Sequence, residues 1–469
     1  MAEAALALVP DAEEASSIES RVADAGRLAV EAIADGFMEK VAEMDLEGIS
    51  RFMLQQGQKV TAAMMGAYLD GRGESEEEQL AHPCPGCGKR VSCREGRKRT
   101  VDTRHGTITF ERPYFHCRSC GSGFFPMDDD LRLAAKAKQH DMSRLALRLL
   151  AEMPYKTAAE IFKEATGLEY SDHCMHGLAE NFQDQCTIDL VLPTRTEVEA
   201  TIEQASGNFR RPVVVVSADG AHEPCRPYTE SREKARGPGY WRKAKGFRVY
   251  LLTKSGVTQI ASWHQIMNEE DFGNALDVAA GILPQEKIRI ALIADGAPWL
   301  WAHLERAFPE GKPVLDYYHV SEHVHKVAKI QYGDETQAAR EWAEATMGRL
   351  WAGEVGSVTW GLERMKPVTP ASQEEIRKLR GYLEKNAEKI NYSAFRRGGY
   401  PIGSGGIESA NKFICHIRIK RSGAWWYEHN ANGIMRIRCA RFNGTLDRIV
   451  EKYKATSGKK RRPRKKRSI

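Results

Sequence analysis

Three acidic residues in the second half of the chain are spaced in a way that could bind metal ions. Asp219 and Asp295 each end a short apolar run and precede a glycine, in SADG and ADGA, and Glu408 follows the glycine-rich stretch GSGG. The apolar runs predict buried strands, and ligands collect where adjacent strands of an open α/β sheet end. With Glu408 on a helix, the carboxylates would offer the oxygen ligands that Mg²⁺ prefers. Two such ions about 4 Å apart can activate a water or a 3′-hydroxyl and stabilise the leaving oxygen of a phosphodiester.

Each acid taken alone also has an ordinary structural explanation. Asp before Gly is common turn chemistry at a strand end, and Glu in a first helical turn interacts favourably with the helix dipole. The combination, in this order on these predicted elements, favours a shared metal site. The glycines would let the chain approach that site closely, and Ser404, or the loop generally, could satisfy the first amides of the helix that carries Glu408. The GSGG run does not fit the pattern of a phosphate-binding P-loop.

Four of the ten cysteines form two C-x-x-C pairs. Cys84 pairs with Cys87 and Cys117 with Cys120, and a glycine after each pair lets the backbone turn under a metal. The stretch between the pairs alternates, is rich in β-branched residues and has a His-Gly turn signal, which predicts a hairpin. Two such knuckles and a hairpin predict a zinc ribbon whose four thiolates fill the coordination of a structural Zn²⁺. A redox pair or unliganded cysteines are the alternative.

The composition is that of a soluble globular protein with a basic end. The 469 residues are 42% hydrophobic and 28% charged, and this length suits about two to four domains. The chain has no run of about 18 apolar residues that would span a membrane, and its N-terminus does not read as a signal peptide, so we expect a cytoplasmic protein. Residues 459–467, KKRRPRKKR, carry eight positive charges, without which the formal net charge of +6 becomes −2. They indicate a flexible arm for a polyanion, with a plain solvated terminus as the alternative.

Hydrophobic periodicity predicts helical segments followed by a mixed sheet. Residues 18–70 have the spacing of an amphipathic bundle that packs or dimerises. Residues 141–185 have a helix-turn-helix outline with Ser171 as a cap, for which DNA reading by 171–181 and simple packing are equally open. From residue 212 the order strand, hairpin, strand, helix, strand, helix, strand, with PVLDYYHV as the fifth strand, is that of a ribonuclease H-like sheet.

The predicted fold class is therefore α/β, with a ribonuclease H-like catalytic core and several additions. The predicted domains are an N-terminal helical region (1–80), a zinc ribbon (81–130), a helix-turn-helix-like DNA-binding domain (131–205), the catalytic core (206–320 and 396–450), a helical insertion (321–395) and a basic disordered tail (451–469).

Several of these motifs together resemble one family. CPGCG…CRSCG, VVVVSADGAH, LIADGAPWLW, LDYYHVSEH and GSGGIESANK followed by RIKRSGAWW are similar to motifs of bacterial insertion-sequence transposases of the DDE class. The likeness is to the ISKra-type group and, more distantly, to Mutator-like and hAT-like elements, over about residues 80–450. It implies that Asp219, Asp295 and Glu408 are the catalytic triad and bind two Mg²⁺ ions, for which Mn²⁺ can substitute. Asp316 and His319 resemble the [C/D]-x-x-H motif that follows the second aspartate, and they would support the site; for His319 a satisfied core histidine is equally open.

The resemblance also implies the partners. The protein would bind transposon terminal inverted repeats and target DNA, and would cleave and transfer a strand as a homodimer or larger assembly at the bacterial nucleoid. Basic and aromatic residues that would neutralise phosphates or stack on an unpaired base gather after Glu408 and in the loop 226–245. They are Lys412, Arg418, Lys420, Arg421, Trp425, Trp426, Arg242, Lys243 and Lys245. Buried core indoles and an ordinary exposed hairpin loop are the structural alternatives.

Two other functions fit part of the pattern. A domesticated transposase could act as a zinc-ribbon and helix-turn-helix DNA-binding protein without cleavage, and a ribonuclease H-fold nuclease could cut without transposition. The presence of all three acids favours an enzyme over the first. The ribbon, the helix-turn-helix outline and the inserted helices favour recognition of DNA ends over simple hydrolysis.

Overall fold

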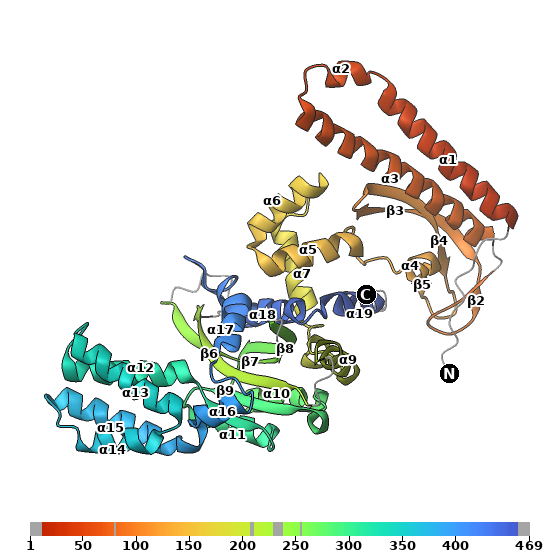
Figure 1. The fold of residues 1–469 in the computed structure, drawn as a ribbon. Helices are drawn as coiled ribbons and strands as arrows, with labels where there is room; N and C mark the ends of the chain where they lie inside the picture. Colours follow the sequence, from red (N-terminus) through yellow and green to blue (C-terminus); the bar gives the residue numbers. More distant parts are fainter. Residues whose placement is uncertain (1–11, 79–80, 207–210, 228–237, 254–255, 458–469) are drawn as a thin grey trace. The chain divides into compact units, whose positions relative to one another are not determined.

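The computed structural model describes residues 12–78, 81–206, 211–227, 238–253 and 256–457 (Figure 1). The chain divides into two compact units, Met1–Ala179 with Val450–Ile469 and Glu180–Ile449. The basic segment 459–467 and the part 228–237 of the predicted loop lie outside the described residues. None of the helices in the described part is both long and apolar enough to cross a membrane.

The N-terminal unit begins with helices packed on a β-hairpin. α1 (Ala12–Ala34) and α3 (Leu46–Glu78) pack against each other, and α3 also packs on β4 (Gly106–His116). β4 pairs antiparallel with β3 (Cys93–Thr103), so the hairpin predicted from the alternating sequence is confirmed. The shorter elements here are α2 (Phe37–Val41), β1 (His82–Pro83), β2 (Arg90–Val91), β5 (Gly123–Phe124) and α4 (Pro126–Asp130).

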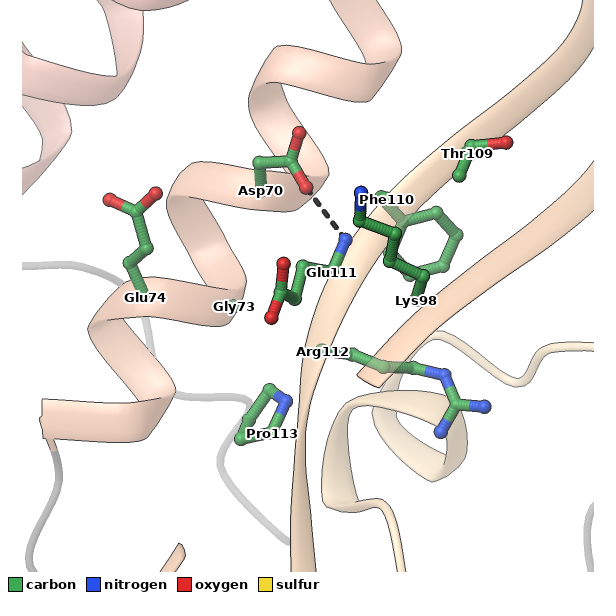
Figure 2. A pocket seen from close by; sticks show the side chains of 9 residues that line it. All are labelled: Asp70, Gly73, Glu74, Lys98, Thr109, Phe110, Glu111, Arg112 and Pro113. Atoms are coloured by element: carbon green, nitrogen blue, oxygen red, sulfur yellow. Dashed lines mark hydrogen bonds between the residues drawn. The ribbon is translucent and has the colours of Figure 1, made fainter. Parts of the chain in front are cut away.

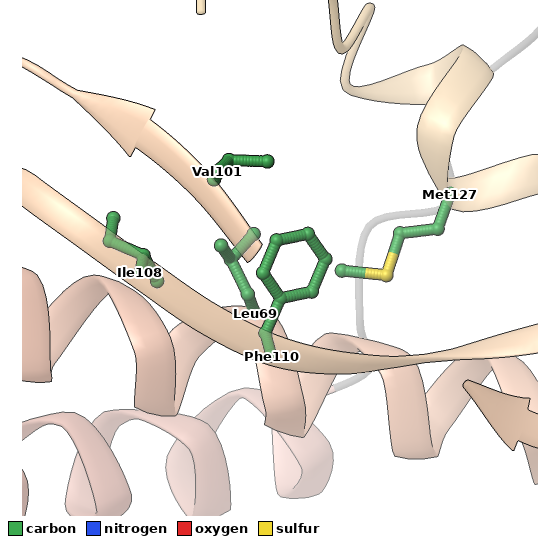
Figure 3. Close-up of a cluster of buried hydrophobic side chains, with 5 residues drawn as sticks. All are labelled: Leu69, Val101, Ile108, Phe110 and Met127. Atoms are coloured by element: carbon green, nitrogen blue, oxygen red, sulfur yellow. The ribbon is translucent and has the colours of Figure 1, made fainter. Parts of the chain in front are cut away.

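A small hydrophobic core holds this hairpin to α3. Ile108 and Phe110 alternate with exposed residues along β4, so both side chains lie on the same face of the hairpin. Leu69 of α3, Val101 of β3 and Met127 of α4 pack with them (Figure 3). Burial of a side chain of this size stabilises a fold by about 1.5–3 kcal/mol, so the cluster anchors the hairpin firmly.

Three helices follow where the sequence predicts a helix-turn-helix outline. They are α5 (His140–Glu152), α6 (Tyr155–Thr166) and α7 (Asp172–Gln183). The break before α6 falls at Pro154, which cannot continue the hydrogen bonding of α5. The backbone N–H of Cys174 donates to Ser171 Oγ over 3.3 Å, which confirms the predicted cap of α7. In the second unit, α8 (Ile188–Val191) and α9 (Arg195–Ser206) precede the sheet.

The second unit is built on a mixed five-stranded sheet with the order β10-β9-β6-β7-β8. The long β6 (Val213–Cys225) pairs antiparallel with β7 (Tyr240–Thr253), which pairs antiparallel with β8 (Gly256–Ile266). On its other edge β6 pairs in parallel with β9 (Arg289–Ala294), and β9 pairs in parallel with β10 (Lys312–Leu315). The first four residues of β6 are all valine and all buried, as expected for a strand in the middle of a sheet covered on both faces.

Helices connect the parallel strands and extend beyond the last one (Figure 1). α10 (Glu269–Ile282), the 3₁₀ turn η1 (Gln285–Lys287) and α11 (Pro298–Ala307) join β8, β9 and β10. A helical segment then precedes Glu408: α12 (Tyr317–Tyr332), α13 (Gln337–Ala352), α14 (Val355–Arg364), α15 (Pro370–Lys385), the turn η2 (Ala387–Lys389) and α16 (Tyr392–Arg397). The last elements of the described part are α17 (Gly405–Ala410), the π-helical turn η3 (Asn411–His416), α18 (Glu428–Phe442) and α19 (Leu446–Ser457).

The fifth strand is shorter than the sequence predicts. PVLDYYHV reads as one strand, but β10 ends at Leu315 and the remainder begins α12. Asp316 causes the change, because its carboxylate accepts hydrogen bonds from the backbone N–H groups of Tyr318 and His319 and so caps the helix.

Candidate active site and metal centre

The sheet brings Asp219 and Asp295 to the same edge. Ser217 of β6 pairs with Ile293 of β9, so the two aspartates, each two residues further along, lie side by side just beyond the point where this parallel pairing ends. The prediction that Asp219 ends its strand is wrong, because β6 continues to Cys225 in its pairing with β7. Asp219 follows the buried valines of β6, and Asp295 directly follows β9. Both acids are half-buried.

Glu408 comes to the same edge from α17. This helix packs on β6 and β7, and the guanidinium of Arg248 donates to the carbonyl of Gly406 over 2.8 Å, which ties the first turn of α17 to β7. Glu408 is exposed and lies in that first turn.

Asp219 feels the charges of the other two carboxylates. Burial raises the pKa of Asp219, and the negative charges of Asp295 and Glu408 raise it further, while the Gly220 N–H and Lys243 act in the opposite direction. The charges of Asp295 and Glu408 therefore reach Asp219, which is required if the three carboxylates are to share a cation. In the described residues their oxygens do not form a set within 4.8 Å of one another. A site for two ions about 4 Å apart does not require that, because its ligands are spread around both ions.

Asp316 links the end of β10 to the loop before Glu408. Ser404 donates to this carboxylate from its backbone N–H, over 3.0 Å to Oδ1, and from its hydroxyl, over 2.8 Å to Oδ2. The same hydroxyl oxygen lies 3.3 Å from Glu408 Oε1. The backbone carbonyl of Ser404 accepts from the N–H groups of Ile407 and Glu408 over 2.9 and 3.2 Å, so Ser404 does satisfy first amides of α17, as predicted. It does so without its side chain, because its single hydroxyl proton is used on Asp316.

His319 does not reach the three acids in the described structure. Its backbone N–H is held by Asp316, but its ring lies against other groups: Nδ1 is 3.5 Å from Glu322 Oε2, and the ring centroid is 5.0 Å from that of His323. Tyr382 of α15 is a residue that sequence reasoning missed. Burial raises the pKa of its phenol, and Asp295 and Asp316 raise it further, so this helical segment contributes a side chain close to the acids.

Asn411 is a second missed residue. It lies three positions after Glu408, and its Nδ2 donates to Asp219 Oδ2 over 3.0 Å. The sequence shows it within the quoted motif GSGGIESANK, but nothing about an Asn at this position indicates a contact with an aspartate almost two hundred residues earlier.

The predicted basic and aromatic residues divide into two groups. Lys412, Lys420, Arg421, Arg242 and Trp425 are exposed, and Lys243 and Lys245 are partly so. Arg418 is only 3% exposed, which disagrees with its predicted contact to a phosphate: its guanidinium packs 5.0 Å from the ring centroid of Trp426.

The two adjacent tryptophans have different surroundings. Trp426 Nε1 donates to the carbonyl of Ile419 over 3.0 Å, and its backbone bridges to Cys225 at the end of β6. Trp425 is 42% exposed and lies edge-on to Trp241, which is 54% exposed, with 6.1 Å between ring centroids. Lys420 Nζ lies 5.4 Å from the Trp241 centroid. Trp241, Trp425 and Lys420, here called the aromatic ledge, form an exposed surface that a base and a phosphate could contact.

A separate cluster of four cysteines in the N-terminal unit fits a metal ion. The Sγ atoms of Cys84, Cys87, Cys117 and Cys120 all lie within 4.8 Å of one another, with 3.4 Å between Cys84 and Cys120. Such spacing matches four thiolates around Zn²⁺, with Zn–S bonds of about 2.3 Å. Among the described residues this is the one group of three or more His, Cys, Asp or Glu side chains that meets this criterion.

The two C-x-x-C turns have the same backbone geometry. Gly88 N–H donates to the Cys84 carbonyl and Gly121 N–H to the Cys117 carbonyl, each over 2.8 Å. Both glycines have φ of 72°, in the left-handed region, which a side chain would disfavour. These turns direct the paired sulfurs of each knuckle toward a common centre, as the zinc-ribbon prediction requires.

A cavity of about 410 Å³ in the N-terminal unit holds none of the predicted site residues. It lies between α3 and β4 and is lined by charges of both signs, including Asp70, Glu111 and Lys98 (Figure 2). Asp70 Oδ1 accepts the backbone N–H of Glu111 over 2.7 Å, so this acid joins the helix to the strand.

Comparison with known proteins gives a family and distant structural likenesses. The Drosophila P element transposase strand transfer complex matches 67% of this chain and 80% of that chain, with 13% identity and a TM-score of 0.24. Among curated proteins, none matches. The profile described as Uncharacterised protein family (UPF0236) matches residues 43–456. Since that match spans most of the sequence, the chain belongs to the uncharacterised protein family UPF0236.

Proposed function

We propose that this protein is a DDE transposase of a bacterial insertion sequence, of the ISKra type, which cleaves and transfers DNA strands with Asp219, Asp295 and Glu408. The observation that carries the proposal is that Asp219 of β6 lies beside the end of β9, which Asp295 follows, and feels the negative charges of both Asp295 and Glu408 of α17. Carboxylates that repel one another in this way are a natural place for divalent cations, which relieve the repulsion.

The sheet supports the same proposal. Its order β10-β9-β6-β7-β8, with two antiparallel and two parallel pairings, is the arrangement expected of a ribonuclease H-like core. The helices between α12 and α16 stand where the predicted helical insertion belongs, between the second aspartate and the glutamate.

The residues of the site would have three roles in the proposed reaction: binding metal ions, holding the loop before Glu408, and neutralising phosphates. Asp219, Asp295 and Glu408 would hold two Mg²⁺ or Mn²⁺ ions, which supply activation of the attacking hydroxyl and stabilisation of the leaving oxygen. Asp316 and Ser404 would keep the loop before Glu408 in place. Exposed cations, such as Lys412, Lys420 and Arg421, would neutralise DNA phosphates near the scissile bond.

The proposed substrates are the terminal inverted repeats of the element and its target DNA, held by a homodimer or larger assembly in the bacterial cytoplasm. The cysteine cluster would hold a structural Zn²⁺, and α5 to α7 would take part in recognising the DNA ends. These roles predict that binding of DNA and cleavage of DNA can be separated by mutation.

Strand cleavage of labelled DNA that carries the repeats flanking the gene, in Mg²⁺ and in Mn²⁺, tests the proposal. Asp219→Asn, Asp295→Asn and Glu408→Gln should each abolish cleavage and leave end binding nearly unchanged, because the metal ligand is lost and the phosphate contacts remain. Asp277→Asn is the matched control, since Asp277 is exposed on α10 and pairs with Arg306. Cleavage by the Asp219 variant at the normal rate would overturn the site. Binding of the ends without cleavage by the unmodified protein would favour a domesticated, DNA-binding role.

A further inference from the structure

Asn411 interacts with Asp219 of β6 and with His264, a buried histidine of β8. The Asn411 side chain is 5% exposed and uses Nδ2 for its bond to Asp219 Oδ2. Its Oδ1 is also buried and has no hydrogen-bond partner of good geometry in the described structure. A buried amide oxygen left in that state costs about 1–3 kcal/mol, so a donor should be nearby.

His264 of β8 is the candidate for that donor. It is fully buried, and neither ring nitrogen has a hydrogen-bond partner of good geometry among the described residues. Burial lowers its pKa to about 3, while a hydrogen bond that the ring donates to the side chain of Asn411 acts in the opposite direction, so the ring is neutral at ordinary pH and interacts with Asn411. A neutral imidazole keeps one N–H, which suits an amide oxygen.

The sheet register explains why the two side chains meet. Asp219 of β6 pairs with Gly246 of β7, and Gly246 pairs with His264 of β8, so the three residues form one row across the sheet. A Cβ on Gly246 would lie 2.1 Å from Cδ2 of His264. The glycine therefore leaves the space that the imidazole occupies, between the sheet and the turn that carries Asn411.

We infer that His264 and Asn411 are positioning residues for the catalytic aspartate. The His264 N–H donates to Asn411 Oδ1, and Asn411 Nδ2 donates to Asp219 Oδ2, which orients the carboxylate and keeps its other oxygen available for a cation. This inference rests on the proposed function, since it assigns how that same site holds its first metal ligand. Hydrogen bonds from a second layer of residues to metal ligands commonly change metal affinity or activity by about 10–100-fold.

The location of Asn411 gives this arrangement a further consequence. It begins the π-helical turn η3, three residues after Glu408, so one short segment carries the third acid and the residue that holds the first. Such π-helical turns are frequent at functional sites because the extra residue re-aims side chains. The relative placement of Asp219 and Glu408 is therefore fixed locally and does not depend on loop contacts alone.

The test measures the Mg²⁺ concentration for half-maximal cleavage together with thermal unfolding. Asn411→Ala and His264→Leu should each raise the Mg²⁺ requirement about tenfold or more. His264→Gln, which keeps a donor, should recover most of that change. The double variant should be no worse than Asn411→Ala, because the pair acts through one bond. Asn443→Ala is the matched control: Asn443 also binds β8, with Oδ1 accepting from Ser262 N over 2.8 Å, but it is not part of the acidic site.

The possible results separate the inference from the proposed function. If the unmodified protein cleaves and Asn411→Ala lowers the unfolding temperature as Asn443→Ala does, with an unchanged Mg²⁺ requirement, the two residues are only structural and the inference is wrong. If the unmodified protein cleaves no DNA, the proposed function fails instead. If His264→Leu does not fold, the Mg²⁺ requirements of Asn411→Ala and Asn443→Ala still show whether Asn411 positions the aspartate or is only structural.

Discussion

Ser404 binds Asp316 with both its backbone N–H and its hydroxyl, at 3.0 and 2.8 Å. This pair joins the start of α12 to the start of α17, so the residue after β10 sets the position of the loop that presents Glu408. The Asp316 carboxylate also caps α12, so one side chain holds both the start of this helix and the loop before α17. Loss of either partner should release the loop without removing a candidate metal ligand.

Ser404→Ala should lower the rate of strand cleavage about 10–100-fold and raise the Mg²⁺ concentration needed for half-maximal cleavage, because Glu408 loses the support of its loop. End binding should change little, since Ser404 is buried and contacts no surface. Single-turnover cleavage across a Mg²⁺ series measures both effects. Ser409→Ala, an exposed position on the same helix, serves as the control. Equal rates for the two variants would show that the Asp316 contact does not matter to the site.

Cys84→Ser should remove the zinc from the N-terminal unit and destabilise its ribbon. A structural Zn²⁺ contributes directly to folding, so loss of one of four thiolates has a large effect on that unit. Elemental analysis should find about one zinc per chain in the unmodified protein and much less in the variant. Cys174→Ser, at an exposed cysteine of α7, should retain the metal. Equal zinc content in the two variants would contradict the ribbon.

Local chemistry explains which features could be predicted from sequence. The paired cysteines, the alternating strands and the acids that follow apolar runs are signals carried by a few neighbouring residues, and each lies on the expected element. Contacts between residues far apart in the sequence carry no such signal. Asn411 contacts Asp219, and Tyr382 of α15 lies near Asp295, only through the tertiary packing of their elements.

The wrong prediction that PVLDYYHV forms a single strand also results from a contact between distant segments. Tyr and Val favour strands, and the residue pattern gave no reason to end the strand at Leu315. The helix begins there because Asp316 caps it and is fixed in turn by Ser404, which is a tertiary contact. Local propensity is a weak guide wherever such a contact decides the backbone.

Trp425→Ala should weaken binding to DNA with an unpaired end while leaving stability nearly unchanged. Base stacking on an exposed aromatic ring is worth about 1–3 kcal/mol, so the affinity should fall by at least several-fold. Trp426→Ala should instead lower the unfolding temperature, since this indole donates to Ile419 and its backbone bridges to β6. Fluorescence anisotropy with single-stranded and duplex ends, together with thermal unfolding, separates the two. A Trp425 variant with full affinity for both ends would remove the aromatic ledge from the binding surface.

Glu223 makes the second unit sensitive to pH. It lies on β6 on the same face as Asp219, is fully buried, and neither of its carboxylate oxygens has a hydrogen-bond partner in the described structure. Burial raises its pKa from 4.5 to about 7, with Lys420 acting in the opposite direction. Between pH 4.5 and about 7, Glu223 therefore keeps its proton in the folded state but loses it in the unfolded state. Stability from this group is fully present below pH 4.5 and is lost as the pH rises through about 7.

Glu223→Gln should therefore stabilise the second unit above pH 7, by up to about 3 kcal/mol, because the neutral amide has no charge to bury. Below pH 4.5 the two proteins should have similar stability, as the native carboxyl is then neutral as well. Denaturant unfolding from pH 4 to pH 9 measures the difference, with the exposed Glu270→Gln as control. A Gln variant whose stability parallels that of the unmodified protein across this range would mean that Glu223 finds a partner, such as the ammonium of Lys420, when it ionises.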